Sequence, residues 1–211
     1  MECTEDAFRA AVKTHMKYGT TSIFPTLSSS TVPMIEQAAE TCTKLMEEKD
    51  SPILGLHLEG HYLNMAMAGG QIPENIKSPD PNEYIPIVET WSCIKRWDAA
   101  PELPGAMQFG KYITAKGILA SVAHTQAEFE DIRTAYEAGY THATHFYNAM
   151  PGFHKRREYK YEGTVESKHE DTKRARIGGL PSFGLTGSQI KNRSLTQAAL
   201  TGSDTLQFDL I

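Results

Sequence analysis

Three residues of types that bind metal ions each stand at the end of a short apolar stretch. They are Glu59, His124 and His145. Residues at matching ends of successive parallel strands can converge on one ion although they lie far apart in sequence. One carboxylate and two imidazoles are a common ligand set for zinc or ferrous iron, with a position left open for water. A metal held there would polarise an acyl oxygen, lower the pKa of bound water, or do both, as amide hydrolysis requires.

Each of these residues also has a simpler interpretation. Glu59 could emerge into solvent after its strand, and a single histidine after an apolar run is more often a hydrogen-bonded structural residue than a ligand. The joint occurrence of three such residues at strand ends favours the metal site. Strand alternation places His142 on the face opposite to His145, so the two histidines of this segment are not a ligand pair.

Two further roles have weaker signals in the sequence. The proton-transferring group is not marked, because Asp98, Asp131 and His57 are candidates by residue type alone. The backbone amides of Asn148 and Ala149, with an arginine from the stretch behind them, would hold a phosphate. By residue type alone, a basic surface turn is the favoured alternative for that stretch.

The elements that must position these residues alternate between strands and helices. Helical patterns begin at the Thr4 cap and end at Gly19, and then cover 31–49, 83–91, 106–116 and 126–138. Strand patterns cover 20–24, 53–59, 93–97, 118–124 and 140–146. Residues 60–81 are rich in glycine and proline and are predicted to form a long loop beyond a strand end. The order predicts an α/β fold with a parallel sheet, wound either as a barrel or as an open sheet.

Composition excludes several classes of protein. The chain has 211 residues, of which 40% are hydrophobic, and one domain is expected. A formal net charge of −5 argues against nucleic-acid binding. No stretch approaches the ~20 apolar residues that span a bilayer, so no membrane partner is expected. The three cysteines lack paired spacing, which favours a reducing compartment, and a cytoplasmic location is predicted.

Four segments together identify a family resemblance. They read GTTSIFPT at 19–26, GLHLEG at 55–60, AHT at 123–125 and ATHFYNAMP at 143–151. In order and local spacing they resemble N-acetylglucosamine-6-phosphate deacetylases, which are metal-dependent hydrolases of the amidohydrolase superfamily with a (β/α)8 barrel. The resemblance covers residues 1–167 and implies hydrolysis of the N-acetyl group of N-acetylglucosamine 6-phosphate to glucosamine 6-phosphate and acetate, a step of amino-sugar catabolism.

The resemblance assigns roles to particular residues. It implies one divalent metal, zinc or ferrous iron, on Glu59, His124 and His145. It implies that Asn148 and Ala149 help to bind the phosphorylated sugar, and that an arginine reaches the phosphate, often across a homodimer. Arg156 fits that role by its distance in sequence from His145, whereas Arg157 fits by its neighbour Glu158; Arg156 is preferred.

The chain also departs from the family pattern within the loop after Glu59. His61 stands where many relatives have proline, and Gln71 stands where a substrate-contacting histidine is usual. Gln71 is therefore retained as a substrate-binding candidate, while His61 is predicted to be an exposed loop residue.

The resemblance ends after Ser167. Residues 1–167 are predicted to form a partial (β/α)8 TIM-type barrel of about five βα units, and residues 168–211 a weakly ordered, irregular tail. The family's later segment with the general acid/base aspartate is not found, so the catalytic residue is unassigned. Three functions follow: a metal-dependent deacetylase, a catalytically incompetent fragment that still binds metal or pairs with another chain, and a different cyclic-amide amidohydrolase.

Overall fold

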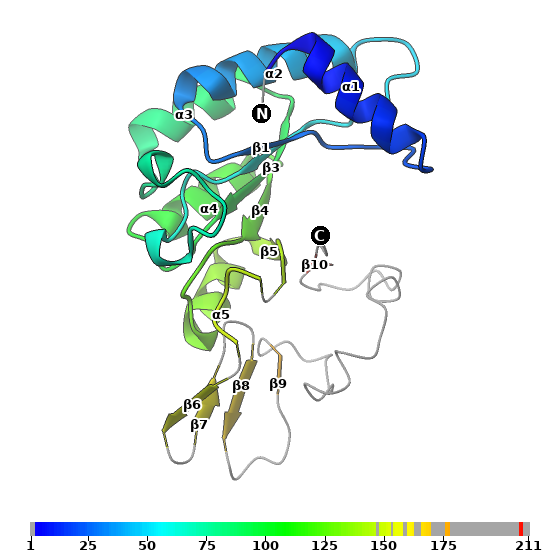
Figure 1. Ribbon diagram of the computed structural model, residues 1–211. Coiled ribbons are helices and arrows are strands. Elements are labelled where there is room, and N and C mark those ends of the chain that lie inside the picture. The colour runs from blue at the N-terminus through cyan, green and yellow to red at the C-terminus, as the bar shows by residue number, and fades with distance from the viewer. Residues whose placement is uncertain are drawn as a thin grey trace.

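A computed structural model describes residues 3–146 and 148–152, together with the backbone of five short strands beyond them. Figure 1 shows a curved parallel sheet whose helices lie along one side. The five strands are β1 (Thr26–Ser28), β2 (Leu56–Glu59), β3 (Ile94–Ala99), β4 (Leu119–Val122) and β5 (Tyr140–Ala143). Each pairs in parallel with the next in sequence order, and β10 (Gln207–Phe208) pairs with β5.

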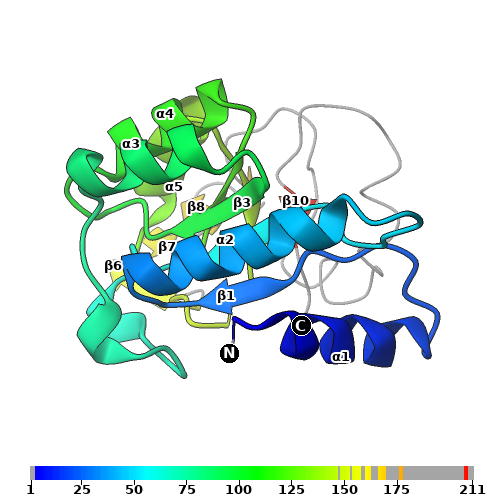
Figure 2. The same ribbon diagram turned by 90° about the horizontal axis from the view of Figure 1, so that it is seen from above.

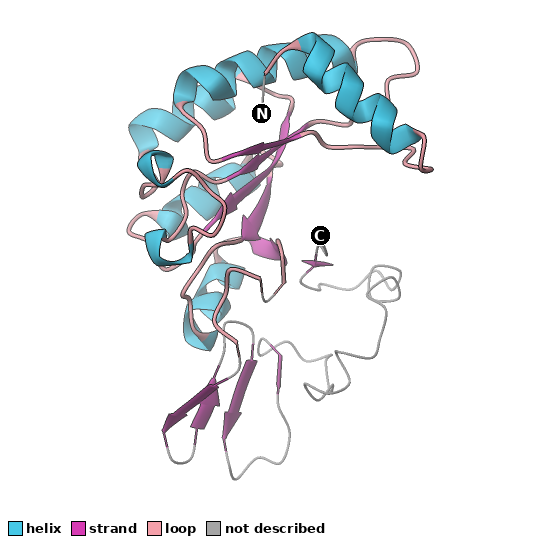
Figure 3. Ribbon diagram, viewed as in Figure 1, coloured by secondary structure: helices cyan, strands magenta, loops and turns pink. Residues whose placement is uncertain are grey.

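Helices connect the strands, as the view from above and the colouring by secondary structure make plain (Figures 2 and 3). They are α1 (Glu5–Met16), α2 (Val32–Met46), α3 (Pro81–Thr90), α4 (Ala106–Ala115) and α5 (Phe129–Glu137). The predicted α/β fold of about five βα units is therefore confirmed. Consecutive parallel order brings the carboxyl ends of all five strands to one edge, which is where enzymes of this architecture hold their sites.

The two faces of the sheet differ in chemistry. On β2, Leu56 and Leu58 are buried on the helix side, while His57 and Glu59 alternate with them. On β3, Trp97 and Ala99 alternate with Arg96 and Asp98 in the same way. The helix side is thus apolar and the opposite side carries the polar residues.

Aromatic rings fill the space between β3 and the helices. The ring of Trp97 stacks on Tyr62 with centroids 5.6 Å apart, and Phe109 of α4 meets both rings edge-on at 5.2 and 5.1 Å. Helix α4 also packs closely on β5, because a Cβ on Gly110 would lie 2.3 Å from Tyr140 Cε2. This packing fixes the strand ends relative to one another.

Two predicted elements differ from the structure. The first strand was expected at 20–24, but it follows Pro25, and Ile23 makes only an isolated bridge to Ile53. Pro25 still contributes, since its carbonyl accepts a hydrogen bond from His57 N at 3.0 Å. Helix α3 begins two residues earlier than the predicted 83–91, at Pro81 after the Asp80 cap, and it contains Pro86 in its interior.

Beyond residue 152 the backbone forms a four-stranded antiparallel sheet. Its strands are β6 (His154–Arg157), β7 (Lys160–Glu162), β8 (Glu166–His169) and β9 (Arg176–Ile177). The predicted tail at 168–211 otherwise lies outside the described residues, and the predicted boundary at residue 167 stays a prediction. In the described part of the chain, no helix has the length and apolar character needed to span a membrane.

The aromatic packing leads to a prediction about stability. Phe109→Ala would leave a cavity between α4 and β3, and we expect the free energy of unfolding to fall by about 3–5 kcal/mol. Urea denaturation measures this loss. Tyr18→Ala, at a side chain that is 87% exposed, is the control and should change stability by less than about 0.5 kcal/mol. Equal effects of the two substitutions would contradict this description of the core.

Candidate metal centre

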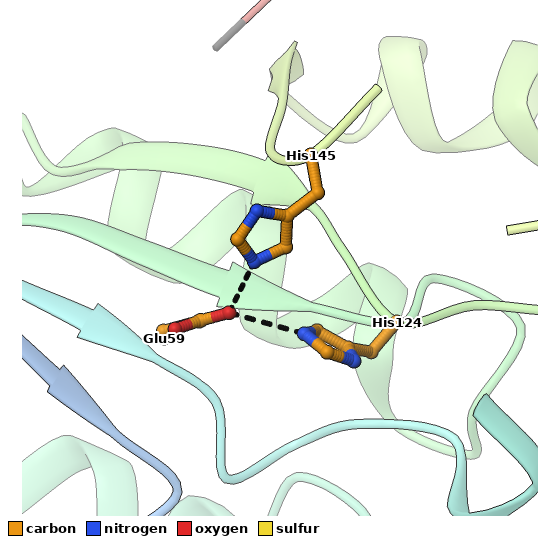
Figure 4. Close-up of side chains that lie close together, drawn as sticks. All are labelled: Glu59, His124 and His145. Carbon is orange, nitrogen blue, oxygen red and sulfur yellow. Dashed lines mark hydrogen bonds and ion pairs between the residues drawn. The ribbon is translucent and has the colours of Figure 1, made fainter. Parts of the chain in front are cut away.

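The three predicted ligands meet at the carboxyl-terminal edge of the sheet. Glu59 is the last residue of β2, while His124 and His145 each lie two residues after the end of β4 and β5. One ligand atom from each lies within 4.8 Å of the other two, and Figure 4 shows both rings pointing at the same carboxylate. His124 Nε2 is 3.0 Å from Glu59 Oε1, and His145 Nε2 is hydrogen-bonded to the same oxygen.

The backbone at both histidines has a conformation that side chains rarely adopt. His124 has φ +43° and His145 has φ +54°, in the left-handed region. Strain of this kind persists where the surrounding structure holds it, and it clusters at functional sites. Because β5 ends at Ala143, the alternation of side chains between the two faces of the sheet no longer applies at His145. His142, still within β5, stays apart from the ligand group and places its Nδ1 2.7 Å from Ser121 Oγ.

Neighbouring groups define the protonation of His124. Its Nδ1 lies 2.8 Å from the carbonyl oxygen of Met67, which can only accept, so Nδ1 carries the hydrogen. Gln71 Oε1 accepts from the backbone N–H of Ser29 at 2.8 Å, and this orients the amide NH2 toward His124 Nε2, 3.3 Å away. In the neutral ring, Nε2 thus presents a lone pair.

This lone pair faces the carboxylate of Glu59, so two acceptors oppose each other at 3.0 Å. The repulsion is relieved by positive charge between them. A proton on Nε2 would face the amide donor of Gln71, whereas a metal ion would accept both the lone pair and the carboxylate. The donor set of Glu59, His124 and His145 therefore fits a metal ion.

The pKa values agree with an attraction for positive charge. Burial by itself would raise the pKa of Glu59 and lower that of His124. The hydrogen bonds within the group outweigh burial, so the pKa of Glu59 lies well below its usual range and that of His124 lies above its usual value.

A second polar layer lies beneath the ligands. His57 Nδ1 is 3.0 Å from an Arg96 nitrogen, which can only donate, so His57 Nε2 carries the hydrogen and donates to Asp98 Oδ1 at 2.9 Å. Thr26 Oγ1 also lies 2.9 Å from His57 Nδ1. Both nitrogens of His57 are thus engaged, and the ring is not free to act as a base.

The other two proton-transfer candidates, Asp131 and Asp98, lie in different places. Asp131 accepts from the backbone N–H of Glu128 at 2.8 Å in the capping box of α5, which is a structural role. Asp98 is fully buried, and its Oδ2 has no hydrogen-bond partner within the described residues. Neither belongs to the ligand group.

The prediction of an exposed His61 is wrong. The side chain is fully buried, with Nε2 2.6 Å from Glu83 Oε1, and Tyr62 donates to the same oxygen at 2.9 Å. Burial opposes ionisation of Glu83, but the hydrogen bonds from His61 and Lys77 outweigh it and lower its pKa to about 2. The loop after β2 therefore folds back onto α3. No pattern near His61 indicates its contact with Glu83, because the two residues are 22 positions apart in the chain.

The predicted substrate residues are placed in part. Gln71 lies beside His124, as described above. Asn148 N donates to the carbonyl of His145, and the carbonyl of Ala149 accepts from Thr125 N at 3.1 Å, so this turn sits next to the ligand loops. The side chain of Arg156 lies outside the described residues.

Comparisons with known proteins agree with this geometry. No family model matches the chain. A curated relative from Haemophilus influenzae is 31% identical over 153 residues, covering 72% of this chain and 40% of the relative, and one from Lysinibacillus sphaericus is 28% identical over 163 residues, covering 74% and 41%. Both are N-acetylglucosamine-6-phosphate deacetylases. The predicted resemblance is confirmed.

Solved deacetylase structures extend the agreement to the fold. The enzyme from Pasteurella multocida matches with a TM-score of 0.72 and 27% identity, over 78% of this chain and 42% of that one. A D267A mutant from Mycobacterium smegmatis, in complex with N-acetyl-D-glucosamine-6-phosphate, matches with a TM-score of 0.68 and 26% identity, over 80% and 41%. The chain thus spans about two fifths of the length of these deacetylases.

The buried polar layer leads to a second prediction about stability. Asp98→Asn keeps the shape of the side chain but removes the charge that His57 and Arg96 face. Because hydrogen bonds to charged groups contribute about 1.5–3 kcal/mol, we expect a loss of that size in urea denaturation. Asp131→Asn is the control, since the amide oxygen of asparagine can still accept from Glu128 N at the start of α5. A loss no larger than that of the control would exclude a structural role for the Asp98 charge.

Proposed function

We propose that Glu59, His124 and His145 bind one divalent cation, zinc or ferrous iron, as the metal centre of an N-acetylglucosamine-6-phosphate deacetylase. The observation that carries the proposal is the convergence of one ligand atom from each of these three residues within 4.8 Å, with His124 Nε2 3.0 Å from the Glu59 carboxylate. The four matching segments and the deacetylase relatives support the same reaction. A cation bound there would polarise the acetyl oxygen and lower the pKa of an attacking water.

Other roles at the site, namely charge compensation, hydrogen bonding and phosphate binding, fall to particular residues. Glu59 offsets one of the two positive charges of the cation, and the two imidazoles bind it without adding charge. The amide of Gln71, oriented by Ser29, offers a hydrogen-bond donor beside the centre. We assign the phosphate of the substrate to the backbone turn at Asn148 and Ala149 and to Arg156, as the family resemblance implies.

Metal binding without turnover is the second candidate function. It is favoured by the placement of the proton-transfer candidates, since His57 is engaged at both nitrogens and Asp131 caps α5. None of the three proton-transfer candidates in the described part of the chain both contacts the ligand group and is free to transfer a proton. The two candidates share the metal centre and differ in acetate release.

Metal binding is tested by calorimetric titration of the purified chain with Zn²⁺. We expect one equivalent to bind, and His124→Ala to weaken binding by at least about 100-fold, because even the outer partners of metal ligands are worth 10–100-fold. His15→Ala, at an exposed histidine on α1, is the matched control and should bind as the unaltered chain does. Equal affinity of the two variants would overturn the assignment of His124.

Acetate release separates the two candidate functions. The Zn²⁺-loaded chain is incubated with N-acetylglucosamine 6-phosphate, with N-acetylglucosamine, and with N-acetylgalactosamine 6-phosphate, since a Shewanella relative at 27% identity is an N-acetylgalactosamine-6-phosphate deacetylase. If the chain is a deacetylase, acetate should be released from a phosphorylated sugar, and the release should stop when Zn²⁺ is removed by a chelator. Binding of Zn²⁺ with no release from any substrate would support the second candidate, and release from the unphosphorylated sugar at the same rate would contradict the phosphate contacts.

A further inference from the structure

Glu102 links three segments around His124. It lies in the turn between β3 and α4, partly buried. Its Oε1 accepts from Gln126 N at 2.7 Å and from Asn64 Nδ2 at 2.8 Å, and its Oε2 accepts from the hydroxyl of Thr125. One carboxylate therefore joins the loop after β2 to the two residues that directly follow His124.

The partners of Glu102 in turn hold the backbone of His124. The N–H of Asn64 donates to the carbonyl of His124 at 2.9 Å. The N–H of Thr125 donates to the carbonyl of Ala149 at 3.1 Å, and the Thr125 hydroxyl, bonded to Glu102, also accepts from Ala127 N at 2.8 Å. The peptide unit that follows His124 is thus fixed on both sides.

These hydrogen bonds restrain the backbone at His124, where its conformation is unfavourable. His124 has φ +43°, a conformation that costs of order 1–3 kcal/mol and persists only when neighbours hold it. A relaxed backbone at this residue would swing the ring away from Glu59. Carboxylates that orient the histidine ligands of metals usually contact the ring itself, whereas here the ring Nδ1 bonds to Met67 and the carboxylate acts on the backbone.

We propose that Glu102 is a positioning residue for the metal centre: through Thr125 and Asn64 it holds His124 in the left-handed conformation that directs Nε2 at Glu59. This inference rests on the proposed metal-binding function. It assigns no contact between Glu102 and the cation or substrate.

The test is a titration with Co²⁺, whose visible absorption changes with its coordination geometry. Glu102→Gln keeps the size of the side chain and one acceptor oxygen, but it removes the charge that strengthens the hydrogen bond from the Thr125 hydroxyl. Thr125→Val removes the hydroxyl and keeps the shape. We expect each substitution to weaken Co²⁺ binding by about 10–100-fold and to reduce the intensity of the absorption. The double variant should be little weaker than the single ones, because both substitutions act on the same contact.

Phe8→Ala is the control for loss of stability. Phe8 is buried on α1, which carries none of the ligands or their partners, so the substitution should lower the urea midpoint while leaving the Co²⁺ spectrum unchanged. If Glu102→Gln lowers only the urea midpoint and binds Co²⁺ with unchanged affinity and spectrum, or if the two substitutions are additive, the positioning role is overturned and the metal centre stands. If the unaltered chain binds no Co²⁺ and no Zn²⁺, the proposed function fails and the inference fails with it.

Discussion

The carboxylate of Glu59 is the point on which the arrangement of the strand ends depends. Its Oε1 lies within hydrogen-bond distance of imidazole nitrogens that follow two other strands, 65 and 86 residues further along the chain. Such a contact is only available when parallel strands lie in register, because a shift of one residue would turn Glu59 toward the helices. The pairing of Ser28 with Glu59, and of Leu58 with Trp97, fixes that register on both sides of β2.

The register also explains the polar layer beneath the ligands. Any residue two positions before Glu59 shares its face, so His57 must be buried on the polar side of the sheet. A buried polar ring requires partners, and Arg96 and Asp98 of the neighbouring strand supply them. The chain thus offsets the cost of a polar interior with a hydrogen-bonded network, while apolar packing is confined to the helix side.

Sequence reasoning predicted what depends on periodicity. Alternation along β2 placed His57 and Glu59 on one face, and the β-then-α order predicted that three strand ends would meet. It missed what depends on contacts across loops. Nothing near His61 in sequence indicates Glu83, and the start of β1 was misplaced because Thr20, Thr21 and Ser22 are β-prone by residue type alone. Strand alternation also loses its meaning at His145, where the backbone has already left the strand.

The loop after β2 shows why the ligand geometry could not be read from the ligands alone. Within a few residues it supplies the Asn64 N–H to the carbonyl of His124, the Met67 carbonyl to the ring Nδ1, and the Gln71 amide to the ring Nε2. Backbone and ring of one histidine are therefore oriented by a segment without strand or α-helix. Because that loop is itself anchored at Glu83 through His61 and at Glu102 through Asn64, the tautomer of His124 follows from packing far from its own strand. A change in the loop should consequently alter the affinity for a cation before it alters the fold.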